Sequence, residues 1–226
     1  MKNTYVNSLL LWMYTRKKAI AIFLILIMIL SVALGVGLSH QSEVMRTAKA
    51  QMAYESQMAL LESEQARTED IENHLNTFLS SIEQENYTAA LEAINYVIEE
   101  DTSVSDYYLK RAGTYVLMEN YDLAMKDFYQ CLDMNPKQPD VYALIGQIYM
   151  EKEDYAKAIE AFGHAIDLSE NQPEVYYNKA ICHMLTGTYD EAAACLRKVI
   201  QSDCDDTLKA DAQTALDTLI NEGIVH

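Results

Sequence analysis

Apolar side chains recur with helical spacing through the second half of the chain, between Ser105 and Cys204. Three consecutive segments of 34 residues repeat one pattern of apolar and polar positions there, with starts at Ser105, Pro139 and Pro173. Each segment holds two amphipathic stretches separated by a short polar turn, and it begins with a serine or a proline, which suits a helix start. The pattern therefore predicts three helix-turn-helix units.

Equivalent positions of the three segments carry side chains of similar size. A small residue at the eighth position allows the first helix to approach its partner closely, and an alanine early in the second helix does the same from the other side. Large residues around them fill the remaining volume. The equivalent sets are Tyr108, Tyr142 and Tyr176; Ala112, Gly146 and Ala180; Tyr115, Tyr149 and His183; Tyr121, Tyr155 and Tyr189; Ala124, Ala158 and Ala192; Phe128, Phe162 and Leu196; and Cys131, Ala165 and Val199.

This period and pattern resemble those of the tetratricopeptide repeat. Pro136 ends the first unit as the family's pattern requires, whereas Glu170 and Cys204 replace that proline in the next two units. Only 7 Gly and 3 Pro occur, and no strand-like alternation interrupts the helical pattern. The resemblance implies an all-α fold, a tetratricopeptide α-solenoid with clear repeats near residues 105–138, 139–172 and 173–206.

A less regular segment precedes the three repeats. One period upstream, the sequence ENYTAALEAINYVIEED matches the second helix of a repeat. The helix before it has lost the pattern, since Phe78 occupies the small eighth position. We predict a degenerate N-terminal repeat near residues 71–104, because the outer face of a terminal repeat has no neighbour to pack on.

A further helix is predicted after the repeats. Asp205 or Asp206 can cap a helix over residues 207–221, and Gly223 can end it. This C-terminal capping helix completes a predicted tetratricopeptide domain over residues 71–222.

The N-terminal part begins with a short basic segment at residues 1–18 and an apolar stretch. Residues 19–38 carry no charge, and 20 helical residues span about 30 Å, the thickness of a bilayer's hydrocarbon core. We therefore predict an N-terminal transmembrane helix at residues 19–38. Arg16, Lys17 and Lys18 directly precede it, and this bias predicts a cytoplasmic N-terminus with the repeats outside the cytoplasm.

Two alternatives stay open in this part of the chain. A cleaved signal peptide also has a basic lead and an apolar core, but this apolar run is long and its best small-x-small site, Ala33 to Gly35, lies inside it. Residues 39–70 contain neither Gly nor Pro, which predicts a helical stalk. Its apolar positions drift around the helix, so a solvated spacer is favoured over self-association through a coiled coil.

The charge distribution excludes one class of partner. All 34 acidic residues follow the apolar stretch, whereas four of the 17 basic residues precede it. An acidic domain repels nucleic acid, so no nucleic-acid partner is expected. The acidity either keeps the helical array soluble or attracts a basic partner.

Residues capable of catalysis or metal binding are scattered. The five histidines have neither metal-ligand nor catalytic-triad spacing, and no phosphate loop or nucleophile motif occurs. We expect no enzyme activity, no cofactor and no metal site, and we interpret His183 as a packing residue in place of a tyrosine. The four cysteines lack zinc-site spacing, and a disulfide between Cys182 and Cys195 is left open.

The resemblance also implies a binding surface. In tetratricopeptide arrays the second, fifth, ninth, twelfth and thirteenth positions of the first helices line a concave groove. Here these positions are mainly aliphatic, with Asp106, Asp140, Glu151 and Glu174 at the edges. The predicted peptide-binding groove consists of Leu109, Gly113, Leu117, Ala143, Gln147, Met150, Tyr177, Ile181 and Met184.

This groove does not fit the carboxylate-clamp mode of the family. That mode uses Lys, Arg and Asn at the second, fifth, sixth and ninth positions, and here only the sixth position offers Lys110 and Asn178. An extended or helical segment with apolar side chains and basic flanks fits better. The capping helix or a neighbouring molecule is the alternative occupant.

The layout is similar to that of bacterial translocon-associated periplasmic tetratricopeptide proteins, which have one span and an acidic repeat domain. We expect a single-pass cell-membrane protein with an extracytoplasmic array that acts as a non-catalytic adaptor or scaffold for a protein or peptide partner. A chaperone-like or translocon-associated factor for exported proteins is one alternative. A structural component of an envelope assembly is another.

Overall fold

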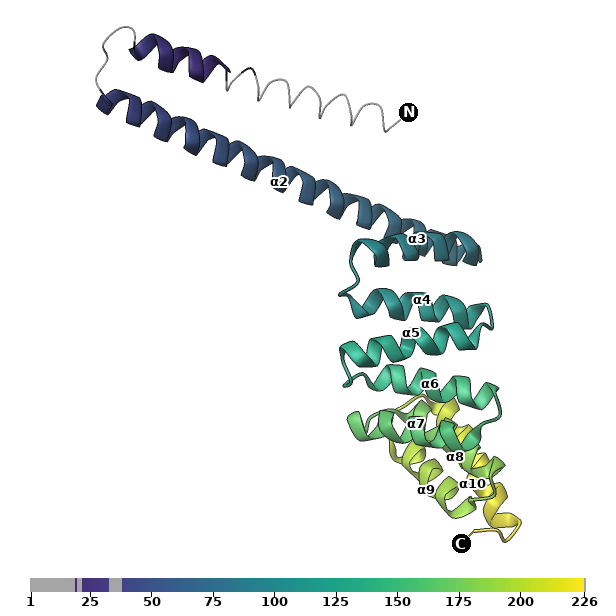
Figure 1. Cartoon of the computed structure of the whole chain (residues 1–226). Helices are drawn as coiled ribbons and strands as arrows, with labels where there is room; N and C mark the ends of the chain where they lie inside the picture. Colours follow the sequence, from purple (N-terminus) through teal and green to yellow (C-terminus); the bar gives the residue numbers. More distant parts are fainter. Residues whose placement is uncertain (1–18, 20–21, 33–37, 226) are drawn as a thin grey trace. The chain divides into compact units, whose positions relative to one another are not determined.

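The computed structural model describes residues 19, 22–32 and 38–225. Its described residues form helices joined by short turns, and none of them lies in a β-strand (Figure 1). Residues 22–32 are helical. The helices that follow are α2 (Leu38–Glu83), α3 (Tyr87–Glu100), α4 (Ser105–Leu117), α5 (Tyr121–Met134), α6 (Pro139–Glu151), α7 (Tyr155–Leu168), α8 (Pro173–Leu185), α9 (Tyr189–Gln201) and α10 (Asp206–Asn221).

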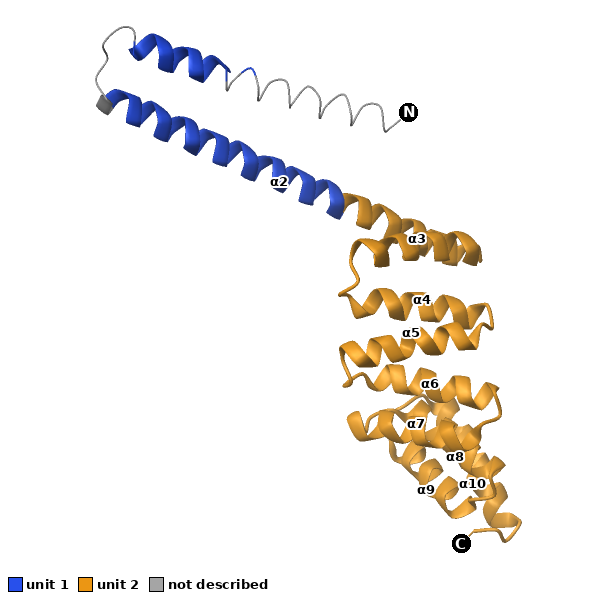
Figure 2. Cartoon of the chain, in the orientation of Figure 1, with its two compact units in different colours: residues 1–68 blue, residues 69–226 orange. Residues whose placement is uncertain are grey.

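The chain divides into two compact units within helix α2, between Thr68 and Glu69 (Figure 2). The predicted boundary between stalk and repeats, at residue 71, lies close to this division. Helix α2 is continuous from Leu38 to Glu83. None of its 46 residues is Gly or Pro, so nothing in the sequence interrupts the helix at this division. The predicted stalk is therefore helical and continues directly into the first helix of the degenerate repeat.

The second unit is built from the predicted helix pairs. Ala112 and Ala180 at the eighth position are 0% exposed, as are Phe128 and Phe162 of the second helices. A Cβ atom on Gly146 would lie 2.5 Å from the ring of Phe162. The ring therefore occupies the space that a side chain at position 146 would need, and the two helices of that repeat approach closely there. The predicted role of the small eighth position is confirmed.

The turn between the two helices of each repeat has a common backbone conformation. Glu85, Glu119 and Glu153 have positive φ angles of 55°, 55° and 57°, and Gly187 at the equivalent position has a φ of 75°. The residue after each of them donates its backbone N–H five residues back, at 2.8 to 2.9 Å. This pattern closes a helix C-terminus. The degenerate repeat therefore has the same turn as the three regular ones.

The degenerate repeat also has its own core. Phe78 of α2 is 5% exposed and packs in one cluster with Ala90 and Ile94 of α3. Beside this cluster, the Tyr96 hydroxyl donates to the Asp70 carboxylate at 2.5 Å, and the His74 ring stacks on Tyr96 with 3.8 Å between centroids. At the eighth position the degenerate repeat therefore has a large side chain in its core, where two of the regular repeats have a buried alanine.

The C-terminal capping helix is present. Asp205 is the N-cap of α10, and its carboxylate accepts a hydrogen bond from the backbone N–H of Thr207 at 3.0 Å. Leu216 and Leu219 of α10 pack with α9 residues in one buried cluster. Gly223 follows the helix with a φ of 67°, as expected for its stop.

The predicted transmembrane helix at residues 19–38 lies partly outside the described residues, which here are 19, 22–32 and 38. Within the part of the chain that the structure describes, no helix combines the length and the apolar character needed to cross a bilayer.

Candidate functional site

The nine predicted groove residues occupy the fifth, ninth, twelfth and thirteenth positions of the repeats. They lie on α4, α6 and α8, with three residues on each helix at spacings of three or four, so each set shares one helix face. None of the nine is buried, although α4, α6 and α8 all contain fully buried residues on other faces. We call this surface, made by the nine residues, the first-helix face.

Residues of the first-helix face pack against the buried cores of the repeats. Leu109 packs against the core that contains Phe128, Met150 against the core that contains Phe162, and Met184 against the core that contains Leu196. Such side chains keep one side on the core and leave the other side accessible. The face is therefore an apolar surface on a fixed scaffold, as a peptide-binding groove requires.

Among the large apolar residues of α4, α6 and α8, the most exposed lie at the C-terminal ends of α4 and α8. Leu117 at the end of α4 is 54% exposed, and Leu185 at the end of α8 is 57% exposed. Glu151 occupies the equivalent position of α6 and is also exposed. This edge of the face is aliphatic with one acidic residue.

A cleft lies at the opposite ends of the first helices. It has a volume of about 630 Å³ between the start of α6, the α7–α8 loop and the start of α8. Ala143, one of the nine predicted residues, belongs to its wall. The lining residues are Pro139, Asp140, Ala143, Leu144, Ser169, Asn171, Gln172, Glu174 and Val175.

The cleft is acidic. Asp140 and Glu174 stand at the second position of their repeats, are exposed, and form no ion pair with any described residue. Asp106, their equivalent on α4, forms an ion pair with Lys110, whose Nζ lies 2.6 Å from Asp106 Oδ2. The uncompensated negative charge of this edge is therefore concentrated at α6 and α8.

Gln172 links the loop to α6 across the cleft. Its Nε2 donates to Asp140 Oδ1 at 3.4 Å, while its Oε1 is buried and accepts no hydrogen bond from a described residue. At the equivalent position, Gln138 donates to the carbonyl oxygens of Cys131 and Asn135 at 2.8 and 2.9 Å. The loop at Gln172 is therefore tied down less completely than its counterpart one repeat earlier.

A second cleft of about 220 Å³ was not predicted from the sequence. It lies between α5, α6 and α7, and the hydroxyl oxygens of Tyr129 and Tyr149 meet across it at 3.2 Å. The hydrogen bond with Tyr149, together with burial, raises the pKa of Tyr129 to about 12. The sequence held one indication of this cleft. Tyr129 is aromatic, whereas the equivalent residues of the next two repeats are Gly163 and Arg197. The lining residues are Tyr129, Tyr142, Ile145, Tyr149, Lys157, Glu160, Ala161 and His164.

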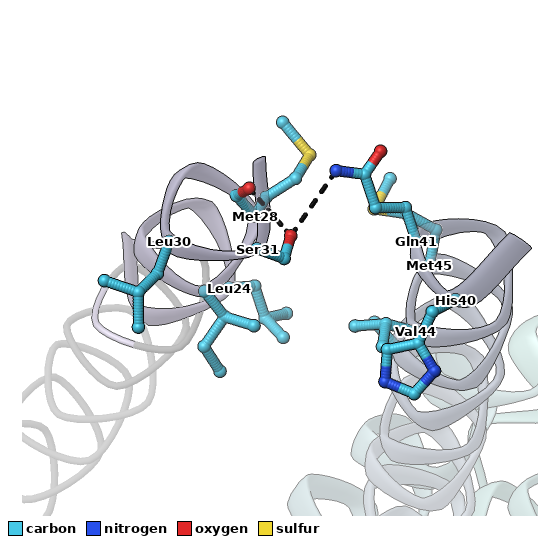
Figure 3. Close-up of a pocket in the computed structure, with 10 residues that line it drawn as sticks. Leu24, Met28, Leu30, Ser31, His40, Gln41, Val44 and Met45 are labelled. Carbon is cyan, nitrogen blue, oxygen red and sulfur yellow. Dashed lines mark hydrogen bonds between the residues drawn. The ribbon is translucent and has the colours of Figure 1, made fainter. Parts of the chain in front are cut away.

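The first unit contains a cavity of its own, of about 240 Å³, between residues 22–32 and the start of α2 (Figure 3). Gln41 Nε2 donates to Ser31 Oγ at 3.4 Å, and Ser31 donates to the carbonyl oxygen of Met28 at 2.9 Å. Apart from His40, no lining residue is ionisable, and most are aliphatic. This cavity offers apolar contact rather than reactive groups.

His183 and Cys182 are buried in the second unit. His183 is 9% exposed, its Nδ1 lies 2.7 Å from Thr188 Oγ1, and burial lowers its pKa. Burial raises the pKa of the Cys182 thiol to about 11, which keeps it protonated, and Cys195 is unpaired in the structure. Among the described residues, no group of three His, Cys, Asp or Glu side chains is arranged to hold a metal ion.

Comparison with known proteins gives the following matches. Family models described as "Tetratricopeptide repeat" match residues 105–138 and 149–216. A crystal structure of MamA protein has a TM-score of 0.60 at 18% identity, over 69% of this chain and 84% of that chain. MamA from Desulfovibrio magneticus RS-1 has a TM-score of 0.54 at 18% identity, over 58% of this chain and 74% of that chain.

A third solved structure is described as YrrB, a tetratricopeptide protein with an unusual peptide-binding site. Its TM-score is 0.55 at 22% identity, over 67% of this chain and 77% of that chain. At such identities the likeness to these structures shows a shared fold. None of the curated proteins compared with this chain matched it.

Proposed function

Because the chain contains tetratricopeptide repeats, we propose that it is a non-catalytic scaffold that binds a protein or peptide partner through the first-helix face. One observation carries this proposal. Nine residues on three successive first helices, mainly aliphatic, stay half-buried or exposed while other faces of each helix pack into a core. Apolar surface that a fold leaves accessible and holds rigid is typical of a docking site.

The polar residues around this face narrow the type of partner. Second-position residues Asp106, Asp140 and Glu174 are all acidic, so an acidic peptide tail would meet repulsion rather than a clamp. YrrB is described by its peptide-binding site, and the fold likeness makes peptide binding a reasonable expectation for this chain as well.

We also propose that the chain is anchored in the cell membrane by residues 19–38, with the repeats outside the cytoplasm. The support is the uncharged sequence of this stretch and the basic residues directly before it. Within its described part, Phe23, Leu30 and Val32 are 62 to 65% exposed. A bilayer would cover these side chains.

The scaffold proposal is tested by removing side chains from the first-helix face. The double variant Leu109→Ala/Tyr177→Ala should lose its partner while keeping its helical circular dichroism spectrum. Leu123→Ala/Tyr189→Ala is the matched control, because it deletes the same residue types from exposed positions on α5 and α9. Crosslinked partners are quantified by mass spectrometry of the tagged chain. Equal recovery with both double variants would remove the first-helix face from the account.

The anchoring proposal has a separate test. A C-terminal tag should be digested by protease added to intact spheroplasts, while a cytoplasmic control protein survives. The chain should also stay with the membrane fraction after carbonate washing. Protection of the tag until lysis would place the repeats in the cytoplasm, and release by carbonate would contradict the anchor.

A structural role through self-association is a second candidate, supported by one observation. In the first unit, α2 exposes Met45, Met52, Met58 and Leu61 at 38 to 58%. Oligomerisation through this helix would cover them. A single-chain mass in detergent solution, measured by light scattering, would argue against it.

A further inference from the structure

We infer that the partner segment is an amphipathic helix with aliphatic residues on one side and Lys or Arg along an adjacent edge, with its cations in the cleft at Asp140 and Glu174. This inference rests on the proposed binding function of the first-helix face. It adds the chemistry and the orientation of the occupant.

The first-helix face has two chemically different edges. Asp140 and Glu174 stand at the starts of α6 and α8, whereas Leu117 and Leu185 stand at the ends of α4 and α8. Eleven helical residues separate the second from the thirteenth position, so the edges lie roughly 16 Å apart along a first helix. An occupant that contacts both must be wide enough to reach from the acidic edge to the aliphatic one.

This width favours a helix over an extended strand. An α-helix with its side chains is about 10 to 12 Å across, and a lysine side chain extends several ångströms beyond its backbone. Side chains of an extended strand alternate between its two faces, so only every second one points toward the repeats. A helix laid across α4, α6 and α8 touches both edges at once.

The negative charge of the acidic edge favours an occupant with positively charged side chains. Lys110 neutralises Asp106 at 2.6 Å, but the equivalents of Lys110 are Leu144 and Asn178, which carry no charge. Asp140 and Glu174 thus face a cleft of about 630 Å³ without a cation from the described chain. An ammonium or guanidinium group fits such a site by charge and by its donors.

The α7–α8 loop holds an unpaired acceptor next to the cleft. Gln172 lines the cleft, and its Oε1 is buried without a hydrogen-bond partner among the described residues. Buried carbonyl oxygens are rarely left unpaired in native proteins. A rotation of the Gln172 amide that turned Oε1 toward the cleft would let a donor of the occupant pair with it.

The test uses two synthetic amphipathic peptides of equal length. The fluorescein-labelled probes are a Leu–Lys peptide (LKKLLKLLKKLLKL) and a Leu–Glu peptide (LEELLELLEELLEL). Anisotropy is measured with the full chain in phosphatidylcholine nanodiscs, and empty nanodiscs give the background. We expect the Leu–Lys peptide to bind, more weakly at high salt, and the Leu–Glu peptide not to bind.

Charge variants locate the site. Asp140→Asn/Glu174→Gln should weaken binding of the Leu–Lys peptide about tenfold. Glu92→Gln/Asp190→Asn removes the same charge from exposed positions on the second helices α3 and α9, and should change binding less than about twofold. Equal losses in both double variants, equal binding of both peptides, or no binding of the Leu–Lys peptide would each overturn the inference.

A third variant separates the two proposals. Leu117→Ser/Leu185→Ser removes the aliphatic edge at positions that are already more than half exposed, so the fold should persist. If this variant weakens peptide binding while the Asp140/Glu174 variant matches its control, the groove stands and the basic-edge inference falls. If the leucine variant has no effect, the first-helix face itself is not the binding site.

Discussion

Arg111 of α4 and Asp127 of α5 form a two-pronged ion pair. Arg111 Nε donates to Asp127 Oδ2 at 2.7 Å, and Nη2 donates to Oδ1 at 2.8 Å. A third donor, Nη1, reaches Asn95 Oδ1 of α3 at 2.7 Å. The hydrogen bond to Asp127 keeps the pKa of the Arg111 guanidinium above its ordinary value. One side chain therefore joins the degenerate repeat to the two helices of the first regular repeat.

Removing the buried partner of this pair should destabilise the array. The Asp127 side chain is 4% exposed, so Asp127→Asn leaves Arg111 without a counter-charge in a poorly hydrated site. We expect a loss of about 2 kcal/mol in the free energy of unfolding, measured with urea. Asp122→Asn is the control, since Asp122 pairs with Lys152 at an exposed site and its loss should not be measurable. Equal effects of the two variants would show that the Arg111–Asp127 pair contributes no more than an exposed ion pair.

Two glycines in neighbouring first helices should respond in opposite directions. Gly146→Ala places a Cβ 2.5 Å from the Phe162 ring, and should cost about 2 kcal/mol of unfolding free energy. Gly113→Ala has nothing within 4 Å of its new Cβ, so it should gain up to about 1 kcal/mol from helix propensity. Thermal unfolding followed by circular dichroism compares the two variants. A stable Gly146→Ala protein would contradict the close contact of α6 and α7.

The turn residues with positive φ offer a test of backbone strain. Glu153 has a φ of 57°, where a side chain is unfavourable, whereas Gly187 has a φ of 75° without that cost. Glu153→Gly should therefore raise the unfolding free energy by about 0.5 kcal/mol, and Gly187→Glu should lower it by about 1 kcal/mol. Urea titrations measure both changes. Changes of the same sign at the two turns would mean that their conformations differ.

His183 should make the stability of the array depend on pH. Burial lowers its pKa in the folded chain, so the unfolded chain binds the proton more readily. Its contribution is therefore complete above the ordinary histidine pKa of about 6.5, and is lost as the pH falls through the lower folded value. Tyrosine occupies the equivalent positions in the other two regular repeats.

The matched variant is His183→Tyr. We expect the unfolding free energy of the wild-type chain to fall between neutral and mildly acidic pH, and the slope to be smaller in His183→Tyr. Urea titrations across this range measure the difference. An unchanged slope would assign the pH dependence to other groups.

The repeats were predictable because packing imposes the same size at equivalent positions. Ala112, Gly146 and Ala180 have to be small, and the sequence shows this directly. The turns were harder to predict, because Glu119 and Glu153 are unusual at positive φ and only their equivalence to Gly187 reveals the conformation. A single glutamate at one of these turns therefore does not indicate a positive φ angle.

The candidate clefts were not predictable from one repeat's pattern. The acidic cleft joins Asp140 of one repeat to Gln172 and Glu174 around the start of the next, so it depends on how successive repeats stack. The cleft at Tyr129 joins a side chain of α5 to α6 and α7 in the same way. Sequence periodicity fixes the helices of a repeat, but the space between repeats depends on side chains that differ from one repeat to the next.

The proposed function requires that a partner protein occupies the first-helix face. The most direct measurement is in-cell crosslinking with a photoreactive phenylalanine analogue at Gln147 on that face or at Gln130 on α5, both of which are exposed. If a partner binds this face, we expect a discrete crosslinked product from Gln147 that is absent with Gln130. Products from Gln130 alone, or the same products from both positions, would contradict it.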